Sequence, residues 1–395
     1  MQLNIDRLNI QTNRGLHMEI LIGGGIAASV IYAAINWSDS DKKKIQKTFE
    51  NVGYKVGDYL PKLKRTHKTD NYTLYTYSVP YGLVDDERLD VLDKVLNKPV
   101  KVTFTDTKLH IKVYAENLKE SYPYSLFSNK GNWYIPIGMT YDGPVYHDFD
   151  KIPHMIVAGS TTWGKTVFMR MMMTHLIENN PNGVKFYVLD LKGGLAFHRY
   201  RNLKQVESVA HDYKTSYNAL SMVKKDIQKD MAYLKSIDAE NAKEGNLKTR
   251  KFIIIDEAGE LIPSSSMSDD EKDYTKGCQR IMSYIARVAG QIGYKMIFGT
   301  QYPTKEILDN QIKANAIARV SFRLTTSVQS GVAIDQTGAE KLEFPGRAIY
   351  KVTDEHLVQT PFISKNEIDE RIGDHYVSAT KKEATTRRTD YVEFG

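Results

Sequence analysis

The chain has 395 residues, enough for two or three domains of ordinary size, and its hydrophobic fraction of 41% is usual for a globular protein. Lysine and arginine exceed aspartate and glutamate by 54 − 48 = 6, a modest excess that permits binding to polyanions without demonstrating it. A single cysteine, Cys278, excludes an internal disulfide framework and is typical of a reducing compartment. Because Cys278 belongs to an apolar helical pattern, we predict a buried and unreactive thiol.

The N-terminal region contains a long uncharged segment. Residues 1–19 form a short mixed tail. Residues 20–38 have no charged side chain, and the length of this segment, 19 residues, is at the lower end of what a membrane-spanning helix requires. Three consecutive glycines weigh against a buried helix, and no clear cleavage motif supports a signal peptide. We predict a single transmembrane helix at 20–38, and the lysines at 42–44 and 47 place the rest of the chain in the cytoplasm.

Residues 45–150 are predicted to form a small α+β domain. Its predicted elements are a strand at 72–79, a helix at 86–96, a hairpin of 100–104 with 109–114, and a second hairpin of 133–137 with the segment around Val145. We find no catalytic constellation in this region. The scattered His110, His147 and His154 are predicted to be structural rather than metal ligands.

Residues 151–365 alternate between strand and helix patterns. Strands are predicted at 155–158, 185–191, 252–257, 295–301, 318–324 and 347–352, and helices at 167–177, 213–237 and 278–289. Near-continuous apolar strands separated by helices indicate an α/β fold with a mostly parallel sheet covered on both faces. Residues 264–272 are predicted to form a polar loop. Residues 366–395 are predicted to form a C-terminal helix followed by a flexible tail.

The segment that follows the first of these strands matches G-x-x-x-x-G-K-[ST] between a strand and a helix. Backbone amides of such a loop and the following helix N-terminus bind phosphate. Lys165 is predicted to reach the β- and γ-phosphates of ATP, and the Thr166 hydroxyl to ligate Mg²⁺. The predicted nucleotide-binding residues are Gly159, Ser160, Thr161, Thr162, Trp163, Gly164, Lys165 and Thr166.

A second apolar strand ends in two acids. We predict that Asp256 orients the Mg²⁺ shell and that Glu257 acts as general base on the attacking water; surface charge is the alternative. At the end of the next strand, Gln301 is predicted to sense the γ-phosphate, with an ordinary polar loop as the alternative. Acids beside a phosphate loop indicate hydrolysis of ATP.

Several blocks of the sequence resemble the FtsK/SpoIIIE family of DNA-translocating motor ATPases. The blocks are Pro153–Thr161, Leu189–Lys192, Ile255–Leu261, Gly299–Pro303, Ile312–Phe322 and Ile334–Leu342. The resemblance implies a RecA-like P-loop NTPase fold, a ring that is a homo-hexamer, and DNA pumped through its centre. Upstream, Val79–Leu83 resembles a domain of the coupling proteins of Gram-positive conjugative elements. Arg319 matches a family arginine and is a candidate to reach a neighbour's γ-phosphate, with a structural salt bridge as the alternative.

The sequence departs from the family pattern at four places. Thr162 and Trp163 replace the usual glycine and serine of the phosphate loop, so Thr162 is expected to strain the backbone and Trp163 to contact base, subunit or DNA. The pair Ser330–Gly331 lacks an expected arginine, and Asp230 stands where the family usually has one. Despite these departures we still expect ATP to bind. They make it less expected that one subunit efficiently triggers hydrolysis in its neighbour.

Together these features predict a membrane-anchored, ATP-hydrolysing DNA translocase that acts as a coupling protein in conjugation. Its expected partners are DNA, single- or double-stranded, a relaxase and a conjugation channel. Two rivals remain: a protein-secretion ATPase of the type VII kind, and a non-hydrolysing, nucleotide-gated adaptor. For DNA contact we consider Lys192 and the segment 198–204, where charge is combined with an aromatic residue; a solvated helix face is the alternative.

Overall fold

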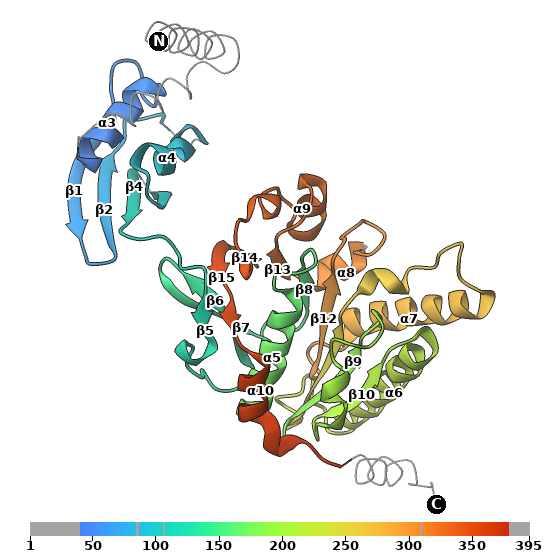
Figure 1. Ribbon diagram of the computed structural model, residues 1–395. Helices are drawn as coiled ribbons and strands as arrows, with labels where there is room; N and C mark the ends of the chain where they lie inside the picture. Colours follow the sequence, from blue (N-terminus) through green and yellow to red (C-terminus); the bar gives the residue numbers. More distant parts are fainter. Residues whose placement is uncertain (1–39, 84–86, 106, 309, 379–395) are drawn as a thin grey trace, which may run out of the picture. The chain divides into compact units, whose positions relative to one another are not determined.

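The computed structural model describes residues 40–83, 87–105, 107–308 and 310–378. The chain divides into two compact units, residues 1–117 and 118–395 (Figure 1). The predicted transmembrane helix at 20–38 and the tail from 381 lie outside the described residues. Within the described ranges, no helix combines the length and the apolar character needed to cross a bilayer.

The first unit is a four-stranded antiparallel sheet in the order β1-β2-β4-β3, with helices packed on it. Its elements are α3 (Asp41–Asn51), β1 (Lys62–Lys68), β2 (Tyr72–Ser78), the 3-10 turn η1 (Glu87–Val91), α4 (Leu92–Leu96), β3 (Val100–Thr105) and β4 (Lys108–Tyr114). The predicted strand at 72–79 and the hairpin of β3 with β4 are confirmed. Strand β1 was not predicted, because six of its seven residues are polar or charged and show no alternation.

The second unit contains a ten-stranded sheet in the order β10-β9-β11-β12-β8-β13-β14-β15-β6-β7. Neighbours from β10 to β13 pair in parallel, and those from β13 to β7 pair antiparallel. The strands are β6 (Tyr134–Thr140), β7 (Gly143–Asp148), β8 (Met155–Ala158), β9 (Val184–Leu189), β10 (Val206–Ala210), β11 (Arg250–Ile255), β12 (Tyr294–Thr300), β13 (Ala318–Phe322), β14 (Arg347–Lys351) and β15 (Glu355–Gln359). Two short strands, β5 (Tyr122–Pro123) and β16 (Pro361–Phe362), form a separate pair.

Helices cover both faces of this sheet, as predicted. They are α5 (Lys165–Asn179), α6 (Tyr213–Ser236), α7 (Asp269–Val288), α8 (Asn310–Asn315), α9 (Ser327–Ile334) and α10 (Lys365–Ile372), with 3-10 turns η2 (Tyr124–Leu126), η3 (His198–Asn202), η4 (Ala258–Leu261), η5 (Ala339–Lys341) and η6 (Gly373–His375). Alternate residues of one apolar strand enter different cores: Val157 packs with α5 and α10, whereas Ile156 packs with α6 and α7. The strands can therefore be apolar throughout, because neither face meets water.

Two boundaries differ from those predicted. The small domain was expected to end at residue 150, but residues 118–150 belong to the second unit. Strands β6 and β7 extend the large sheet beyond β15, and Ile135 and Ile137 are buried in its core. The loop predicted at 264–272 is also too long, because Ser268 and Glu271 form a capping box from which α7 begins at Asp269.

Candidate nucleotide-binding site

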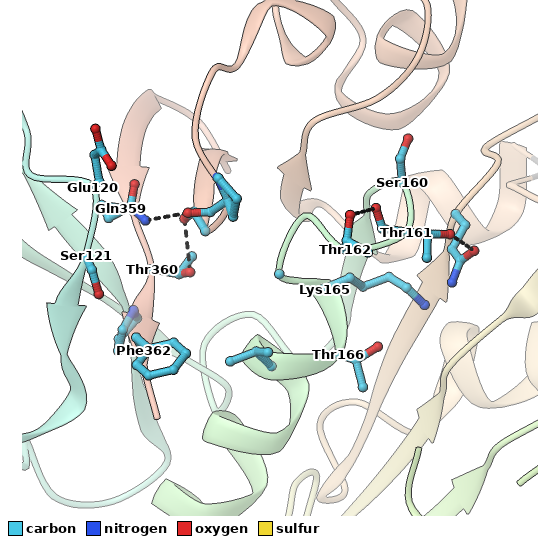
Figure 2. Close-up of a pocket in the computed structure, with 16 residues that line it drawn as sticks. Glu120, Ser121, Ser160, Thr161, Thr162, Lys165, Thr166, Gln359, Thr360 and Phe362 are labelled. Carbon is cyan, nitrogen blue, oxygen red and sulfur yellow. Dashed lines mark hydrogen bonds between the residues drawn. The ribbon is translucent and has the colours of Figure 1, made fainter. Parts of the chain in front are cut away.

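The phosphate loop lies between β8 and α5, as the motif predicts (Figure 2). The Gly159 amide donates to the Thr300 carbonyl at 3.0 Å, and the Ser160 amide donates to the Arg323 carbonyl at 2.9 Å. Helix α5 begins at Lys165 after Gly164, which has no side chain to cap it. The amides of a helix's first turn have no intrahelical acceptors and carry partial positive charge, so this end of α5 suits a phosphate.

The loop holds a strained backbone at one position. Thr162 has φ = 72°, in the left-handed region where a side chain costs about 1–2 kcal/mol. This is the strain expected from threonine in place of the family's glycine. At Gly164 (φ = 111°) a larger residue would be tolerated less well than threonine is at position 162, because a Cβ on Gly164 would lie 3.2 Å from the Gly346 backbone.

Trp163 is held by its own chain. Its carbonyl accepts from the Gly346 amide at 3.0 Å, and the Arg323 guanidinium lies 4.7 Å from its ring centroid. The half-buried ring also packs against the core that contains α5. Its predicted contacts with base, subunit or DNA stay predictions, and in this structure its role is to fix the loop.

A cavity of about 510 Å³ adjoins the loop (Figure 2). Its phosphate end is formed by the loop and the start of α5. The opposite end comes from three distant segments and is lined by Glu120, Ser121, Pro345, Gly346, Gln359, Thr360, Pro361 and Phe362. Thr360 is fixed there, since its amide and hydroxyl donate to the Gly346 carbonyl at 2.9 and 3.0 Å. Sequence reasoning missed this end of the cavity, because no local motif marks it.

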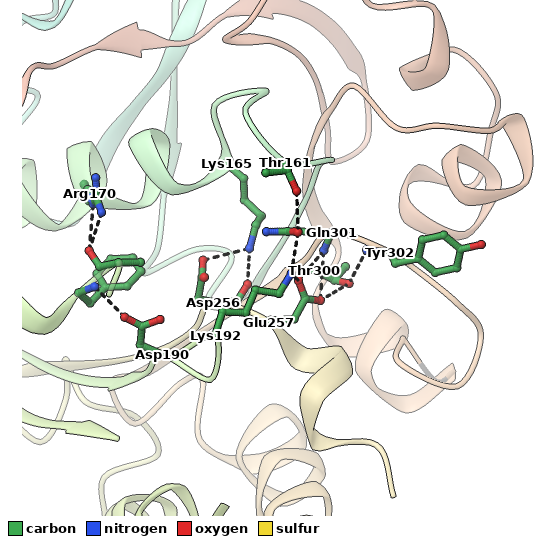
Figure 3. A network of polar contacts seen from close by, with 12 residues as sticks. Thr161, Lys165, Arg170, Asp190, Lys192, Asp256, Glu257, Thr300, Gln301 and Tyr302 are labelled. Carbon is green, nitrogen blue, oxygen red and sulfur yellow. Dashed lines mark hydrogen bonds and ion pairs between the residues drawn. The ribbon is translucent and has the colours of Figure 1, made fainter. Parts of the chain in front are cut away.

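Lys165 and Asp256 form a buried ion pair (Figure 3). The Lys165 Nζ lies 3.0 Å from an Asp256 carboxylate oxygen and also donates to the Asp256 carbonyl. Both side chains are less than 5% exposed. Burial of an unpaired charge is costly, so removal of either partner would leave the other buried beside the phosphate loop without its counterion.

Glu257 lies in a polar network with two other predicted site residues, Gln301 and Thr161, and with Lys192, which was not predicted for this site (Figure 3). One of its carboxylate oxygens accepts from the Thr300 hydroxyl at 2.9 Å, and the Gln301 amide donates to the carboxylate at 3.0 Å. The Lys192 ammonium lies 3.2 Å from Glu257 and donates to the Gln301 side-chain oxygen at 2.6 Å. The Thr161 hydroxyl donates to the same Gln301 oxygen at 3.0 Å, which joins the network to the phosphate loop.

Lys192 is therefore a site residue that sequence reasoning assigned to another role. It follows β9, whose carboxyl end lies beside that of β11, and this adjacency in a parallel sheet was the available signal. The neighbouring Asp190 is buried, and burial together with the nearby Asp256 raises its pKa. Its carboxylate accepts from the Phe197 amide at 2.7 Å and so fixes the loop that carries Lys192.

The structure places Arg319 outside the cavity. On β13, its guanidinium pairs with Asp335, and Lys313 pairs with the same carboxylate at 2.5 Å. The salt bridge considered from the sequence is thus present. Action on a neighbouring subunit's nucleotide stays a prediction.

The segment 198–204 was considered for DNA contact, but its aromatic residue is not available; contact through the exposed Arg201 and Lys204 stays a prediction. Tyr200 is fully buried in the core, and Arg199 pairs with Asp369 on α10. The 3-10 turn η3 therefore attaches the chain's C-terminal part to the sheet.

The fold and the site define a P-loop nucleoside triphosphatase domain. The FtsK/SpoIIIE family model matches residues 122–303. "DNA translocase FtsK" of Shewanella oneidensis is 28% identical over 290 residues, 67% of this chain and 32% of that protein. The protein of the same name from Helicobacter pylori J99 is 25% identical over 359 residues, 80% of this chain and 41% of that protein. This chain thus spans less than half of these relatives.

Solved structures show the same fold. The pCW3 conjugation coupling protein TcpA, in monomer form with ATPγS, is 20% identical with a TM-score of 0.63, covering 85% of this chain and 99% of that one. The cytoplasmic domain of the type VII secretion ATPase EccC of Thermomonospora curvata is 16% identical with a TM-score of 0.54, covering 66% and 33%. These structures share the fold of this chain, and its residues 122–303, which contain the phosphate loop, match the FtsK/SpoIIIE family model.

Proposed function

We propose that this chain hydrolyses ATP to move DNA. The observation that carries the proposal is the arrangement of Lys165, Asp256 and Glu257 at the phosphate loop of an FtsK/SpoIIIE family domain. The name of the S. oneidensis relative and the ATPγS bound to TcpA support DNA as the moved polymer and ATP as the fuel.

The site fits a magnesium nucleotide. An uncapped helix end, a buried lysine and a cavity of about 510 Å³ suit a triphosphate and its nucleoside. The Thr166 hydroxyl and the Asp256 carboxylate are oxygen donors of the kind that Mg²⁺ takes. When bound, Mg²⁺ would neutralise phosphate charge.

The protein groups then have distinct roles. The loop amides and Lys165 hold the phosphates, and Lys165 exchanges part of its contact with Asp256 for them. Glu257 orients a water and accepts its proton, while the Thr300 hydroxyl and the Gln301 amide fix the carboxylate. The Gln301 side chain contacts both Thr161 of the phosphate loop and Lys192, which contacts Glu257. In this proposal, loss of the γ-phosphate therefore changes the position of Glu257 through Gln301.

We further propose that the chain is a coupling protein in conjugative DNA transfer and works as a homo-hexamer. The likeness to TcpA, which extends over most of both chains, supports this choice. In this proposal residues 20–38 anchor the ring in the cell membrane by a single span with the ATPase domain in the cytoplasm, where a relaxase and a channel meet it. Membrane fractionation tests the anchor: a variant lacking residues 1–40 should leave the membrane, and retention there would contradict the proposed topology.

The type VII secretion ATPases are the second candidate, because EccC shares the fold. ATPase assays of the full chain with and without DNA separate the possibilities. A DNA motor should be stimulated several-fold by DNA, a protein-secretion ATPase should hydrolyse ATP without that stimulation, and a nucleotide-gated adaptor should show no turnover. Parallel assays with single- and double-stranded DNA identify the form that is moved.

A further inference from the structure

The sheet of the first unit has one covered face and one open face. Tyr77, Leu109 and Ile111 are fully buried and pack with Ile45 and Phe49 of α3. Side chains alternate between faces, so their strand neighbours point the other way. The pairing register aligns those neighbours in three rows across the sheet: Lys62, Ser78, Lys108 and Thr105; Arg65, Thr76, His110 and Thr103; His67, Leu74, Lys112 and Lys101. We call this set the open sheet face.

Contacts between side chains confirm the alignment. The Thr76 hydroxyl lies 3.2 Å from the His110 Nδ1 on the adjacent strand. The Lys112 ammonium lies 3.9 Å from the Tyr72 ring centroid, with Tyr72 at the end of the same face. The rows thus form one continuous surface on which cations, hydroxyls and imidazoles are neighbours.

The strands that form the open sheet face carry basic residues and no acidic ones. Strands β1 to β4 contain seven lysine or arginine residues and no aspartate or glutamate. The side chains of Lys62, Arg65 and Lys108 are exposed. In the part of the chain that the structure describes, these three have no carboxylate within salt-bridge distance. The acids in the described part of this unit lie in its helices, turns and connections instead.

We propose that the open sheet face binds the phosphate backbone of DNA. This inference rests on the proposed function and adds a contact surface outside the ATPase unit. Cations and hydroxyl donors spread over several strands are the groups that bind phosphate oxygens. The aromatic residues do not offer free rings for bases, because Lys112 covers Tyr72 and Tyr114 is buried. The face therefore binds DNA without sequence preference.

The composition of the face favours nucleic acid over a lipid surface. Membrane-binding surfaces add exposed apolar or aromatic groups to their cations. The large apolar side chains exposed in the described part of this unit are Val56, Tyr59 and Tyr81, and none belongs to these strands. Leu74, the apolar member of the open sheet face, is only partly exposed.

The test compares two triple variants of the full chain that lose the same charge. The first, Lys62→Gln with Arg65→Gln and Lys108→Gln, removes three cations from the open sheet face. The control, Lys225→Gln with Lys229→Gln and Lys235→Gln, removes three exposed cations from α6. Affinity for a labelled 30-base-pair duplex and for one of its strands is measured by fluorescence anisotropy from 50 to 200 mM salt, and thermal unfolding shows whether each variant is folded.

We expect the first variant to bind the duplex on the order of 10²-fold more weakly at 0.1 M salt, with a salt slope smaller by about 2.7. The control should stay within about threefold of the wild type. A third variant, Lys62→Arg with Arg65→Lys and Lys108→Arg, keeps the charge and should retain binding. All variants should keep the basal ATPase rate.

Three results would overturn the inference. One is that the folded first variant binds DNA with the affinity and the salt slope of the wild type. If DNA still stimulates its ATPase activity, the motor proposal would stay intact. Another is an equal loss in the α6 control. The third is loss of binding to anionic phospholipid vesicles without loss of DNA binding, which would assign the face to the membrane. A wild-type chain that binds no DNA would instead contradict the proposed function itself.

Discussion

The two sheets of this protein differ in what their faces can do. The ten-stranded sheet is covered by helices on both faces, and its chemistry is confined to one edge, where Lys192, Asp256, Glu257 and Gln301 follow the carboxyl ends of parallel strands. The four-stranded sheet is covered on one face only, and its other face carries cations without acids. In a sheet covered on both faces, side chains can reach a ligand only from the ends of the strands. In a sheet with one open face, side chains of several strands can contact an extended polymer.

The largest effect is expected at the phosphate loop. Lys165→Ala removes the cation that we propose binds the phosphates, and it leaves Asp256 buried without its partner. ATP hydrolysis should fall by about 10³-fold, which a coupled-enzyme assay measures. DNA affinity through the open sheet face should not change, since that face belongs to the other unit. Unchanged turnover in this variant would contradict the assignment of the site.

A smaller effect is expected at Lys192. Lys192→Met removes the ammonium that contacts both Glu257 and Gln301, and kcat should fall by about 10- to 10²-fold. Lys192→Arg keeps the charge and should lose less activity than Lys192→Met. Steady-state ATPase assays measure kcat for both variants. Equal kcat values for the two variants and the wild type would show that Lys192 does not act on the base.

A stability effect is expected where the site meets the covered sheet. A Cβ on Gly299 of β12 would lie 2.5 Å from the Asp256 carbonyl oxygen and 2.6 Å from the Met169 side chain. Gly299→Ala should therefore cost about 2–4 kcal/mol and displace Asp256. Gly331→Ala in α9 is the matched control: apart from its chain neighbours and its own helix backbone, no atom lies within 4 Å of the added Cβ, and it should stabilise by about 0.5–1 kcal/mol. Chemical denaturation measures both, and equal stabilities would contradict the packing described here.

The smallest effect concerns acid sensitivity. Burial lowers the pKa of His147 to about 4 and that of His154 to about 3. Below pH 6.5 the unfolded chain binds protons that the folded chain does not, so stability falls as the pH falls toward those values. Each histidine should contribute up to about 1.4 kcal/mol per pH unit. Denaturation between pH 7 and 5 should give a shallower slope for His147→Gln than for the exposed control His198→Gln; equal slopes would refute this.

What the sequence predicts well in this protein is local. The phosphate loop occupies eight consecutive residues, and Asp256 and Glu257 directly follow an apolar strand, so both could be found without a structure. The end of the cavity opposite the phosphate loop could not. Gly346 and Thr360 meet there through the antiparallel pairing of β14 with β15, and Glu120 reaches it beside the pairing of β5 with β16.

The same reasoning explains the other differences. Lys192 could be placed at a strand end, but its contact with Glu257 depends on which strand is the neighbour of β9. The open sheet face went unrecognised because β1 lacks alternation, and only its pairing with β2 shows that Lys62 and Arg65 share a face with Lys108. The Ser268–Glu271 capping box, by contrast, is a local sequence signal for the start of α7.

In the proposed mechanism, Glu257 drives hydrolysis of an ATP held by the phosphate loop. The most direct measurement is the identity of the nucleotide that remains bound after incubation with labelled ATP and Mg²⁺. Glu257→Gln should bind ATP with near wild-type affinity and retain it as ATP, while the wild-type protein retains ADP. Formation of ADP by Glu257→Gln at the wild-type rate would contradict the account.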